Sequence, residues 1–461
     1  MGATQSVCPQ CLRRLPAQRV AIGDAIYLEK ECPEHGSFRT VIWRGLEQYR
    51  KWESKCTAAS RPPAARAVSK GCPYDCGLCE EHRQHTCCVV MEVTSRCNLR
   101  CPVCFASASP KAAANEPSLE EIRLWCRDLM RRGGPFNIQL SGGEPTLRDD
   151  LPEIVALIRQ EGCNFVQLNT NGLRLASDAA YAQRLQQAGL GCVFLQYDGV
   201  TAVTHRTLRG RDLRSVKLRA IRNCGLAGLG VVLVPTIVKG LNSGEIGLLL
   251  KQAIELAPVV RAVHFQPLSY FGRYPSNIGE EGRITLPELL AAIERQSQDR
   301  FHAGDFYPAS GENAFCEFHG KFTLQLGGKV TAAPRPKTAC CAPPPAPLVT
   351  LGATAGGEGA RRARQFVAQH WAAPQPAEPS PADLDLSSLD AFLEQQRHSF
   401  CISAMAFMDA WNLDLERLQE CFLHAYSPDG KLVPLCAYNL TAATGGALYR
   451  NHDAEREGGV R

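Results

Sequence analysis

Short apolar runs alternate with amphipathic stretches over residues 88–300. Six apolar runs have the length of strands: Cys88–Thr94, Phe136–Leu140, Cys163–Asn169, Cys192–Tyr197, Leu229–Pro235 and Val260–Gln266. Six stretches have a helical period: Ser118–Arg132, Asp150–Gln160, Asp178–Ala188, Asp212–Cys224, Gly244–Leu256 and Pro287–Ser297. Ser118 and Glu121 form a capping box for the first helix. This series predicts an α/β fold, with a parallel sheet joined by crossover helices.

Six strand–helix units are fewer than the eight of a complete barrel, so the pattern favours an open, partial (β/α)6 barrel. Barrel enzymes carry their chemistry at the C-terminal ends of the strands, and polar side chains gather at those positions here. They are Asn169, Asn171, Gln196, Asp198 and Gln266. Four cysteines lie within the apolar patterns and are expected in the core: Cys126, Cys163, Cys192 and Cys224.

Composition narrows the class of protein. With 461 residues, 45% apolar and 21% charged, the chain is expected to fold as a barrel domain with flanking modules. Its longest apolar runs fall short of a membrane span, and Cys8 and Cys11 lie where a signal peptide would need an apolar core. We therefore expect a cytoplasmic protein. The net charge of +5 comes without a basic block or RNA-binding motif, so nucleic acid is not expected as a partner.

The chain has 22 cysteines, and many of them fall in short C-x2-C and C-x3-C-x2-C groups. In a reducing compartment such groups indicate metal binding and not disulfides. The central group is Cys97, Cys101 and Cys104, directly after the first barrel strand. Three thiolates on one loop can hold three irons of a [4Fe-4S] cluster and leave the fourth iron open. A zinc loop is the alternative, but its spacing is normally C-x2-C or C-x4-C.

A second motif, Gly142-Gly143-Glu144-Pro145, ends the second strand. Together with the cysteine loop, it resembles the radical S-adenosylmethionine (SAM) superfamily. That resemblance implies that the open iron binds SAM, that Gly142 to Pro145 bind the SAM amino group, and that reduction releases a 5′-deoxyadenosyl radical. It also implies a partial barrel. Asn169 and Asn171 would then face SAM, and Gln196, Asp198 and Gln266 would line the SAM or substrate cavity.

Two cysteine-rich segments precede the barrel. Residues 1–60 carry Cys8, Cys11 and Cys32, with either His35 or Cys56 as the fourth ligand of a small metal-centred ribbon. His35 would favour zinc, whereas Cys56 would allow a rubredoxin-like iron site. Residues 61–87 hold a second C-x3-C-x2-C group with a nearby fourth thiol, an auxiliary cluster site or a second zinc knuckle. Its residues are Cys72, Cys76, Cys79 and Cys87, with Cys88 as the alternative to Cys87.

The C-terminal module, residues 301–450, contains a low-complexity insertion at about 332–385 and precedes a tail at 451–461. Within the insertion, the basic segment Arg361–Trp371 suits either a solvated insertion, which we favour, or peripheral contact with an anionic membrane. Four widely spaced cysteines could hold a further cluster or be buried apolar residues. They are Cys316, Cys401, Cys421 and Cys436.

A narrower resemblance rests on Cys8-Pro9-Gln10-Cys11, on Gly71 to Cys79 leading into the cysteine loop, and on Leu435-Cys436-Ala437-Tyr438-Asn439. These segments are similar to the tetraether lipid synthase and dihydro-hydroxymethylpterin dimethyltransferase group. The resemblance implies one or two auxiliary [4Fe-4S] clusters, a mononuclear Fe or Zn site, and a ferredoxin, flavodoxin or reductase as electron donor.

The same resemblance implies carbon–carbon bond formation between lipid alkyl chains, which would need a long apolar tunnel. One alternative is radical methylation or modification of a pterin or peptide. A second alternative is a non-catalytic iron–sulfur electron-transfer protein, which the Gly-Gly-Glu-Pro motif disfavours. The substrate would be a lipid or another small molecule bound together with SAM.

Overall fold

The computed structural model describes residues 1–53, 61–62, 67–110, 116–275, 279–308, 313–325, 329–333, 357–373 and 398–450. Cys56 and the insertion outside 332–333 and 357–373 lie beyond these ranges. None of the helices in the described part of the chain is long and apolar enough to cross a membrane.

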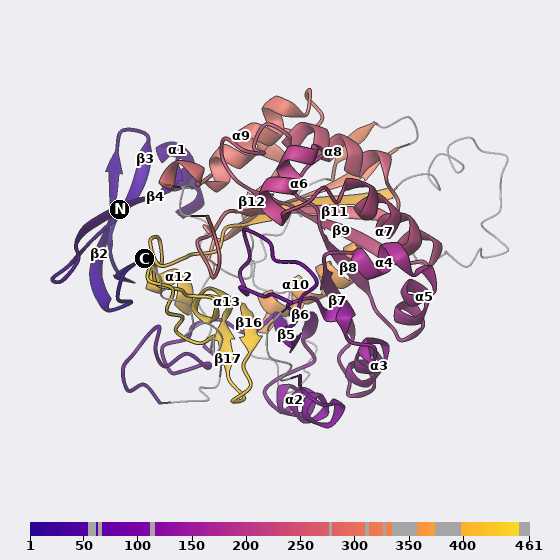
Figure 1. Ribbon diagram of the computed structural model, residues 1–461. Coiled ribbons are helices and arrows are strands. Elements are labelled where there is room, and N and C mark those ends of the chain that lie inside the picture. Colours follow the sequence, from indigo (N-terminus) through magenta and orange to yellow (C-terminus); the bar gives the residue numbers. More distant parts are fainter. Residues whose placement is uncertain are drawn as a thin grey trace, which may run out of the picture.

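The N-terminal segment forms a four-stranded antiparallel sheet at one side of the molecule (Figure 1). Its strands are β1 (Ala3–Val7), β2 (Arg14–Ile22), β3 (Ala25–Cys32) and β4 (Gly36–Arg44), and α1 (Leu46–Glu53) follows. The turn after β1 carries Cys8 and Cys11, and the β3–β4 hairpin carries Cys32 and His35. Both turns are therefore placed to present metal ligands.

The predicted barrel strands form one parallel sheet in the order of the sequence. They are β5 (Cys88–Thr94), β6 (Asn137–Gly142), β7 (Phe165–Thr170), β8 (Cys192–Gln196), β9 (Gly230–Val234) and β11 (Val260–Pro267). The short β10 (Thr236–Ile237) pairs with β11. The α/β prediction is confirmed, and β5 has the predicted bounds.

The predicted helices also form, and they lie outside the sheet (Figure 1). They are α2 (Leu119–Arg131), α3 (Leu151–Gln160), α5 (Ala179–Gln187), α7 (Arg214–Leu226), α8 (Ile246–Glu255) and α9 (Leu286–Gln296). The capping box of α2 is present, because Glu121 N–H donates to Ser118 Oγ and Ser118 N–H to the Glu121 carboxylate. Short elements that the pattern did not predict are α4 (Leu173–Ser177), α6 (Ala202–Arg209), η1 (Pro145–Leu147), η2 (Glu280–Gly282) and η3 (Ala303–Asp305).

The C-terminal module extends the barrel sheet at both edges. Strand β15 (His398–Met405) pairs in parallel with β11, and β16 (Leu423–Tyr426) pairs in parallel with β5. Antiparallel strands continue outward, with β13 (Glu317–Leu324) on β15, and β17 (Leu432–Pro434) on β16. The remaining elements are β12 (Tyr307–Pro308), β14 (Val330–Ala332), α12 (Leu415–Gln419) and α13 (Leu435–Tyr438). The module is thus continuous with the barrel sheet.

Helix α10 (Gly357–Trp371) comes from the insertion and lies at the N-terminal ends of the barrel strands. Asn137 Nδ2 donates to Arg364 O at the start of β6, and Arg364 Nη1 donates to Thr86 O just before β5. The indole of Trp371 packs on Phe194, with ring centroids 5.0 Å apart. The expectation of a solvated insertion was wrong at this segment, because the barrel covers its apolar side. The cysteine loop follows β5 at the opposite end of the sheet.

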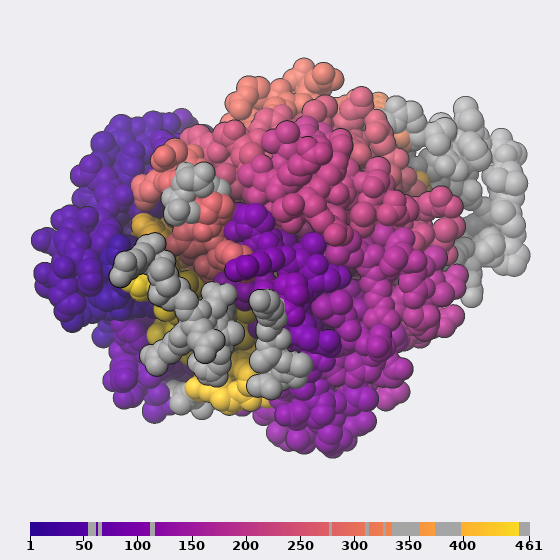
Figure 2. Space-filling view, in the orientation of Figure 1, coloured from indigo at the N-terminus to yellow at the C-terminus, as the bar shows by residue number. Residues whose placement is uncertain are grey.

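The N-terminal sheet is fastened to the C-terminal module by buried polar contacts. Lys30 Nζ donates to Ala410 O and Trp411 O, both at 2.8 Å, and Arg19 pairs with Asp414 at 2.7 Å. The space-filling view shows yellow C-terminal residues between the indigo N-terminal sheet and the barrel (Figure 2). Segments from the two ends of the chain are therefore neighbours.

Candidate functional site

A cavity of about 840 Å³ extends through the barrel from the cysteine loop to α10. Cys97, Cys101 and Cys104 line one end, and Phe366 and Trp371 line the other. The cavity therefore has room for a cofactor at the cysteine loop and a substrate beyond it.

The cysteine loop is held by Arg273, from the segment after β11. Its Nε donates to Cys101 O at 2.7 Å, and its backbone exchanges hydrogen bonds with Cys104 at 2.8 and 3.0 Å. Burial raises the pKa of Cys97 to about 12, and burial likewise raises that of Cys101. These shifts favour the protonated thiols of Cys97 and Cys101, and metal binding would release their protons. Three thiols converging on one cavity fit a cluster with one open iron.

Gly142 and Gly143 allow the end of β6 to approach the strand that leads into the cysteine loop. A Cβ added to Gly142 would lie 2.1 Å from Thr94 O, and one added to Gly143 would lie 2.1 Å from Arg96 O. Gly142 also has φ +126°, which favours glycine. Both glycines line the cavity, so backbone is exposed to a ligand beside the cysteines.

Glu144 lines the same wall, but its carboxylate is already engaged. It accepts hydrogen bonds from Thr146 Oγ1 and Thr170 Oγ1, both at 2.6 Å, and from Asn171 N–H at 2.7 Å. These contacts tie the ends of β6 and β7 together. Pro145 is buried at the start of η1 and is not among the residues that line the cavity.

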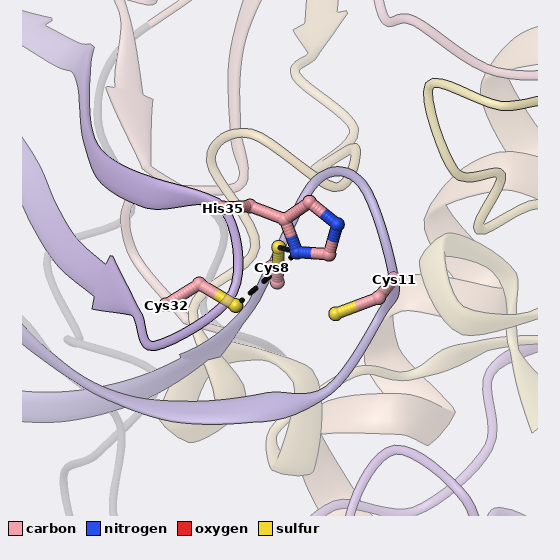
Figure 3. A group of neighbouring side chains, drawn as sticks. All are labelled: Cys8, Cys11, Cys32 and His35. Atoms are coloured by element: carbon pink, nitrogen blue, oxygen red, sulfur yellow. Dashed lines mark hydrogen bonds between the residues drawn. The ribbon is translucent and has the colours of Figure 1, made fainter.

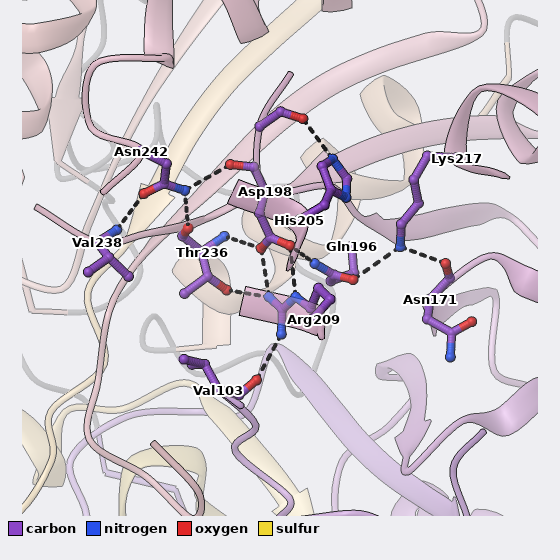
Figure 4. A network of polar contacts seen from close by, with 11 residues as sticks. Val103, Asn171, Gln196, Asp198, His205, Arg209, Lys217, Thr236, Val238 and Asn242 are labelled. Atoms are coloured by element: carbon purple, nitrogen blue, oxygen red, sulfur yellow. Dashed lines mark hydrogen bonds and ion pairs between the residues drawn. The ribbon is translucent and has the colours of Figure 1, made fainter. Parts of the chain in front are cut away.

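Three of the strand-end residues, Asn171, Gln196 and Asp198, belong to one network of polar contacts (Figure 4). Asn169, Asn171, Gln196 and Gln266 line the cavity, as the barrel pattern predicted. Lys217 from α7 is buried beneath them and donates to Asn171 O at 2.6 Å and to Gln196 Oε1 at 3.0 Å. Burial lowers the pKa of Lys217 to about 8, although Asp198 opposes that shift. Lys217 thus fixes two cavity-lining segments from behind.

Asp198 differs from its prediction, because it is fully buried and is not among the cavity-lining residues. It pairs with Arg209, whose Nη2 lies 2.6 Å from Asp198 Oδ1 and whose Nε lies 2.7 Å from Oδ2. Burial alone would raise the pKa of Asp198, but the Arg209 guanidinium outweighs burial and lowers it. Arg209 reaches the cavity and donates to Val103 O within the cysteine loop at 2.8 Å. Asp198 therefore positions Arg209.

The end of the cavity near α10 contains ionisable groups from β13. Glu317 and His319 are each about one-fifth exposed because they face the cavity, and Glu317 Oε1 lies 3.9 Å from His319 Nδ1. Burial raises the pKa of Glu317 to about 8 and lowers that of His319 to about 4. Both side chains are therefore neutral near pH 7. Gln167 Oε1 and His319 Nδ1 are buried and have no hydrogen-bond partner within the part of the chain that the structure describes.

A second wall of the cavity is apolar. It consists mainly of side chains from the cysteine loop and the C-terminal module: Val90, Phe105, Met405, Phe407, Phe422 and Leu435. Phe105 meets Phe407 edge to face, with ring centroids 5.7 Å apart. The cavity therefore offers hydrogen-bonding groups on one side and hydrocarbon on the other.

The N-terminal cysteines meet in a compact group with His35 (Figure 3). The ligand atoms of Cys8, Cys11, Cys32 and His35 all lie within 4.8 Å of one another. His35 Nδ1 is 3.4 Å from Cys32 Sγ and 3.6 Å from Cys8 Sγ. A Cys3His set at this spacing suits one tetrahedral zinc ion.

Cys72, Cys76 and Cys79 line a separate small cavity together with His82. Cys87, the predicted fourth ligand, lines the main cavity and packs in the same buried cluster as Cys72 and Cys76, and its role as a ligand stays a prediction. The second cysteine group is therefore gathered, with a histidine beside it.

The widely spaced C-terminal cysteines are not all brought together. Cys316 accepts a hydrogen bond from Arg417 Nη2 at 3.4 Å, and Arg417 is also close to Cys436. Ala406 N–H donates to Cys316 O, so Ala406 lies beside Cys316. Cys401 comes five residues before Ala406 in extended chain, and five extended residues span about 16 Å. It packs with Cys192 and Trp371 in the barrel interior. Cys401 therefore does not join the predicted set, whereas Cys316, Cys421 and Cys436 stay a prediction.

Sequence reasoning missed residues that complete the cavity wall. Arg450 lines it, pairs with Glu92 of β5 and donates to Asn439 Oδ1 at 2.8 Å. Of Asn439, Arg450 and Arg209, only Asn439 belongs to a motif recognised in the sequence. No local sequence pattern connects it with the two arginines.

Comparison with family models identifies two segments. Residues 1–44 match the HMPTM N-terminal zinc ribbon domain, and residues 91–253 match the radical SAM superfamily. The zinc-ribbon fold and the radical SAM domain are thus both present, in agreement with the fold predicted from the sequence.

Comparison with individual proteins gives a match along nearly the whole chain. The chain is 34% identical to a 7,8-dihydro-6-hydroxymethylpterin dimethyltransferase of Methanocaldococcus jannaschii, over 95% of this chain and 93% of that protein. It is 34% identical to an Fe-coproporphyrin III synthase of Methanosarcina barkeri, over 45% of this chain and 49% of that protein. A crystal structure of Streptococcus suis SuiB bound to S-adenosylmethionine aligns with 46% of this chain and 47% of its own, at 14% identity and a TM-score of 0.39. The chain is a radical SAM enzyme and belongs to the family that includes the dihydro-hydroxymethylpterin dimethyltransferase of M. jannaschii.

Proposed function

We propose that Cys97, Cys101 and Cys104 hold the SAM-binding [4Fe-4S] cluster. When bound, this cluster supplies the electron that cleaves SAM to methionine and a 5′-deoxyadenosyl radical. The supporting observation is that the three cysteines share one cavity wall with the exposed backbone of Gly142 and Gly143. In this proposal that backbone receives the SAM amino group, Asn169 and Asn171 lie beside SAM, and Arg209 fixes the loop. The radical then takes a hydrogen atom from a substrate deeper in the cavity.

The test is anaerobic reconstitution followed by addition of SAM and dithionite. The parent protein should form 5′-deoxyadenosine, whereas Cys97→Ala should lose about four irons and form none. Cys224→Ala serves as the matched control, because Cys224 is buried on α7 away from the cavity. An unchanged yield from Cys97→Ala would contradict the assignment.

We propose that the substrate is a polar heterocycle such as a pterin, and that the reaction is its radical methylation or modification. The observation that carries this proposal is the set of hydrogen-bonding groups at the end of the cavity near α10, where Gln167 and His319 have buried atoms that no other described residue bonds. Such atoms cost free energy unless a ligand binds them, and hydrocarbon cannot do so. The similarity to a pterin dimethyltransferase over 95% of the chain favours the same class.

Lipid carbon–carbon coupling, the reaction first expected from the sequence, remains the second candidate. The apolar wall formed by Phe105, Phe407 and Phe422 favours it, because alkyl chains could lie along that surface. The two candidates differ in their products. Methyl transfer from SAM also yields S-adenosylhomocysteine, whereas alkyl coupling converts SAM to methionine and deoxyadenosine alone and gives a product that lacks two hydrogens.

The two candidates also differ in their response to substitution. Glu317→Gln should raise the KM for a pterin several-fold and leave substrate-free deoxyadenosine formation unchanged. Glu153→Gln on the exposed side of α3 is the matched control. An unchanged KM, together with turnover of a dialkyl lipid, would refute the heterocycle proposal and favour coupling.

A further inference from the structure

One buried histidine near the second cysteine group has no assigned role. His82 comes from the turn after Cys79 and lines the small cavity that contains Cys72, Cys76 and Cys79. It is 5% exposed, and its Nε2 atom is buried without a hydrogen-bond partner among the described residues. Leaving such a nitrogen unpaired costs free energy, and a group bound to it would remove that cost.

The backbone and ring contacts of His82 fix its position. Its N–H donates to Cys79 O at 2.9 Å, and the neighbouring Arg83 N–H donates to Gln419 O at 2.7 Å. The ring packs edge-on against the buried ring of His424, with centroids 4.9 Å apart. The imidazole is therefore held beside the three thiols by both the turn and the C-terminal module.

The spacing of these four side chains does not suit a single zinc ion. Among the described residues, the set whose ligand atoms all lie within 4.8 Å is Cys8, Cys11, Cys32 and His35, so the atoms around Cys72 are spread more widely. Tetrahedral zinc, with Zn–S bonds of about 2.3 Å, needs sulfur atoms within about 4 Å of one another. A four-iron cluster binds each ligand through a different iron and so accepts a wider set.

We propose that His82 Nε2 is the fourth ligand of an auxiliary iron–sulfur cluster held by Cys72, Cys76 and Cys79. The inference rests on the auxiliary cluster that the family resemblance implies, and it leaves Cys87 on the wall of the main cavity. Histidine ligands raise the reduction potential of Rieske clusters above that of plant-type ferredoxins, and the same direction is expected here. His82→Cys should therefore give a cluster with a lower potential.

The test uses the full chain carrying Cys97→Ala, Cys101→Ala and Cys104→Ala, which removes the signal of the SAM-binding cluster. The protein is reconstituted anaerobically, reduced and studied by pulsed electron paramagnetic resonance, with and without 15N-labelled histidine. We expect a strong 14N coupling that 15N-histidine replaces. The coupling should vanish in His82→Cys and persist in His85→Ala, the matched control, whose half-buried side chain lines neither cavity.

Three results would overturn the proposal, and they are distinguishable. If the iron and sulfide contents fall in Cys72→Ala but the reduced cluster shows no nitrogen coupling, the auxiliary cluster is present and His82 is not its ligand. Iron and sulfide unchanged in Cys72→Ala would show that the auxiliary cluster itself is not there. Zinc in place of iron at this site would refute both the auxiliary cluster and its ligation by His82. Because 15N labelling needs no substitution at position 82, poor folding of His82→Cys cannot hide the answer.

Discussion

Replacing Arg209 with methionine should destabilise the protein by about 3 kcal/mol, because the Asp198 carboxylate would lose its buried counter-charge. The pair is 2.6 Å apart, and its side chains are 8% and 0% exposed. Removing one partner of such a pair costs about 3–5 kcal/mol. The low end applies here, because Thr236 N–H would still donate to Asp198 Oδ1 at 3.1 Å.

A double-mutant cycle separates this pairing from simple loss of packing. Asp198→Asn, Arg209→Met and the double variant are compared by urea denaturation of the anaerobically reconstituted protein. The double variant should be more stable than the sum of the single losses predicts, with a coupling of at least ~1 kcal/mol. Lys51→Met, in an exposed pair with Glu47, is the control and should leave the midpoint unchanged.

The pH dependence follows from the direction of the pKa shift. Burial raises the pKa of Asp198, but Arg209 outweighs burial, and the folded value lies below the unfolded value of 3.8. The pair therefore contributes its full stability above that pH and loses it as the pH falls through the lower, folded pKa. In the parent protein the pair should therefore contribute a constant stability between pH 6 and 8. Additive single losses, or a coupling that disappears within this range, would refute the reasoning.

Three further predictions concern other parts of the structure. Gly143→Ala, whose Cβ would lie 2.1 Å from Arg96 O, should abolish SAM binding measured by calorimetry, whereas Gly304→Ala, with nothing within 4 Å, should not. Cys11→Ser should lower the zinc content by one ion per chain, measured by mass spectrometry, and leave the iron count unchanged; an equal loss of iron would contradict separate sites. Because burial raises the pKa of Glu317 from 4.5 to about 8, stability should fall between these pH values by at most about 1.4 kcal/mol per unit. Glu317→Gln should flatten that slope in chemical denaturation, and an unchanged slope would place the titration elsewhere.

The barrel could be predicted because its strands and helices follow from the apolar pattern of each short segment. A parallel strand covered on both faces is a continuous apolar run, and a helix that covers it has one apolar side, so β5 to β9, β11 and their helices appear directly in the pattern. The cysteine loop and Gly142-Gly143 could also be predicted from the sequence, since each is a short motif at a strand end. The N-terminal metal group was found for the same reason.

The remaining parts depend on contacts between residues far apart in the chain. Nothing near His398–Met405 indicates that β15 will pair with β11, or that Leu423–Tyr426 will pair with the first barrel strand. The segment that forms α10 was recognised within the low-complexity insertion, but its contact with the barrel was not, because Phe366 and Trp371 have a clear role only once the barrel end is built. Asp198 had the right strand position for the cavity, but its side chain is turned to Arg209, whose place on α6 the pattern did not show.

Strand β5 pairs with β16 of the C-terminal module and leads into the cysteine loop. Glu92 of β5 lies five residues before Cys97, and it accepts hydrogen bonds from Tyr438 Oη at 3.1 Å and from the Arg450 guanidinium. Asn439 holds Arg450 in turn, and β16 pairs along the first half of β5. Docking of the C-terminal module therefore sets the position of the strand from which the cysteine loop begins. Within the closing Cys-Ala-Tyr-Asn segment, Asn439 lines the cavity, and Tyr438 and Asn439 reach the start of the cysteine loop through Glu92 and Arg450.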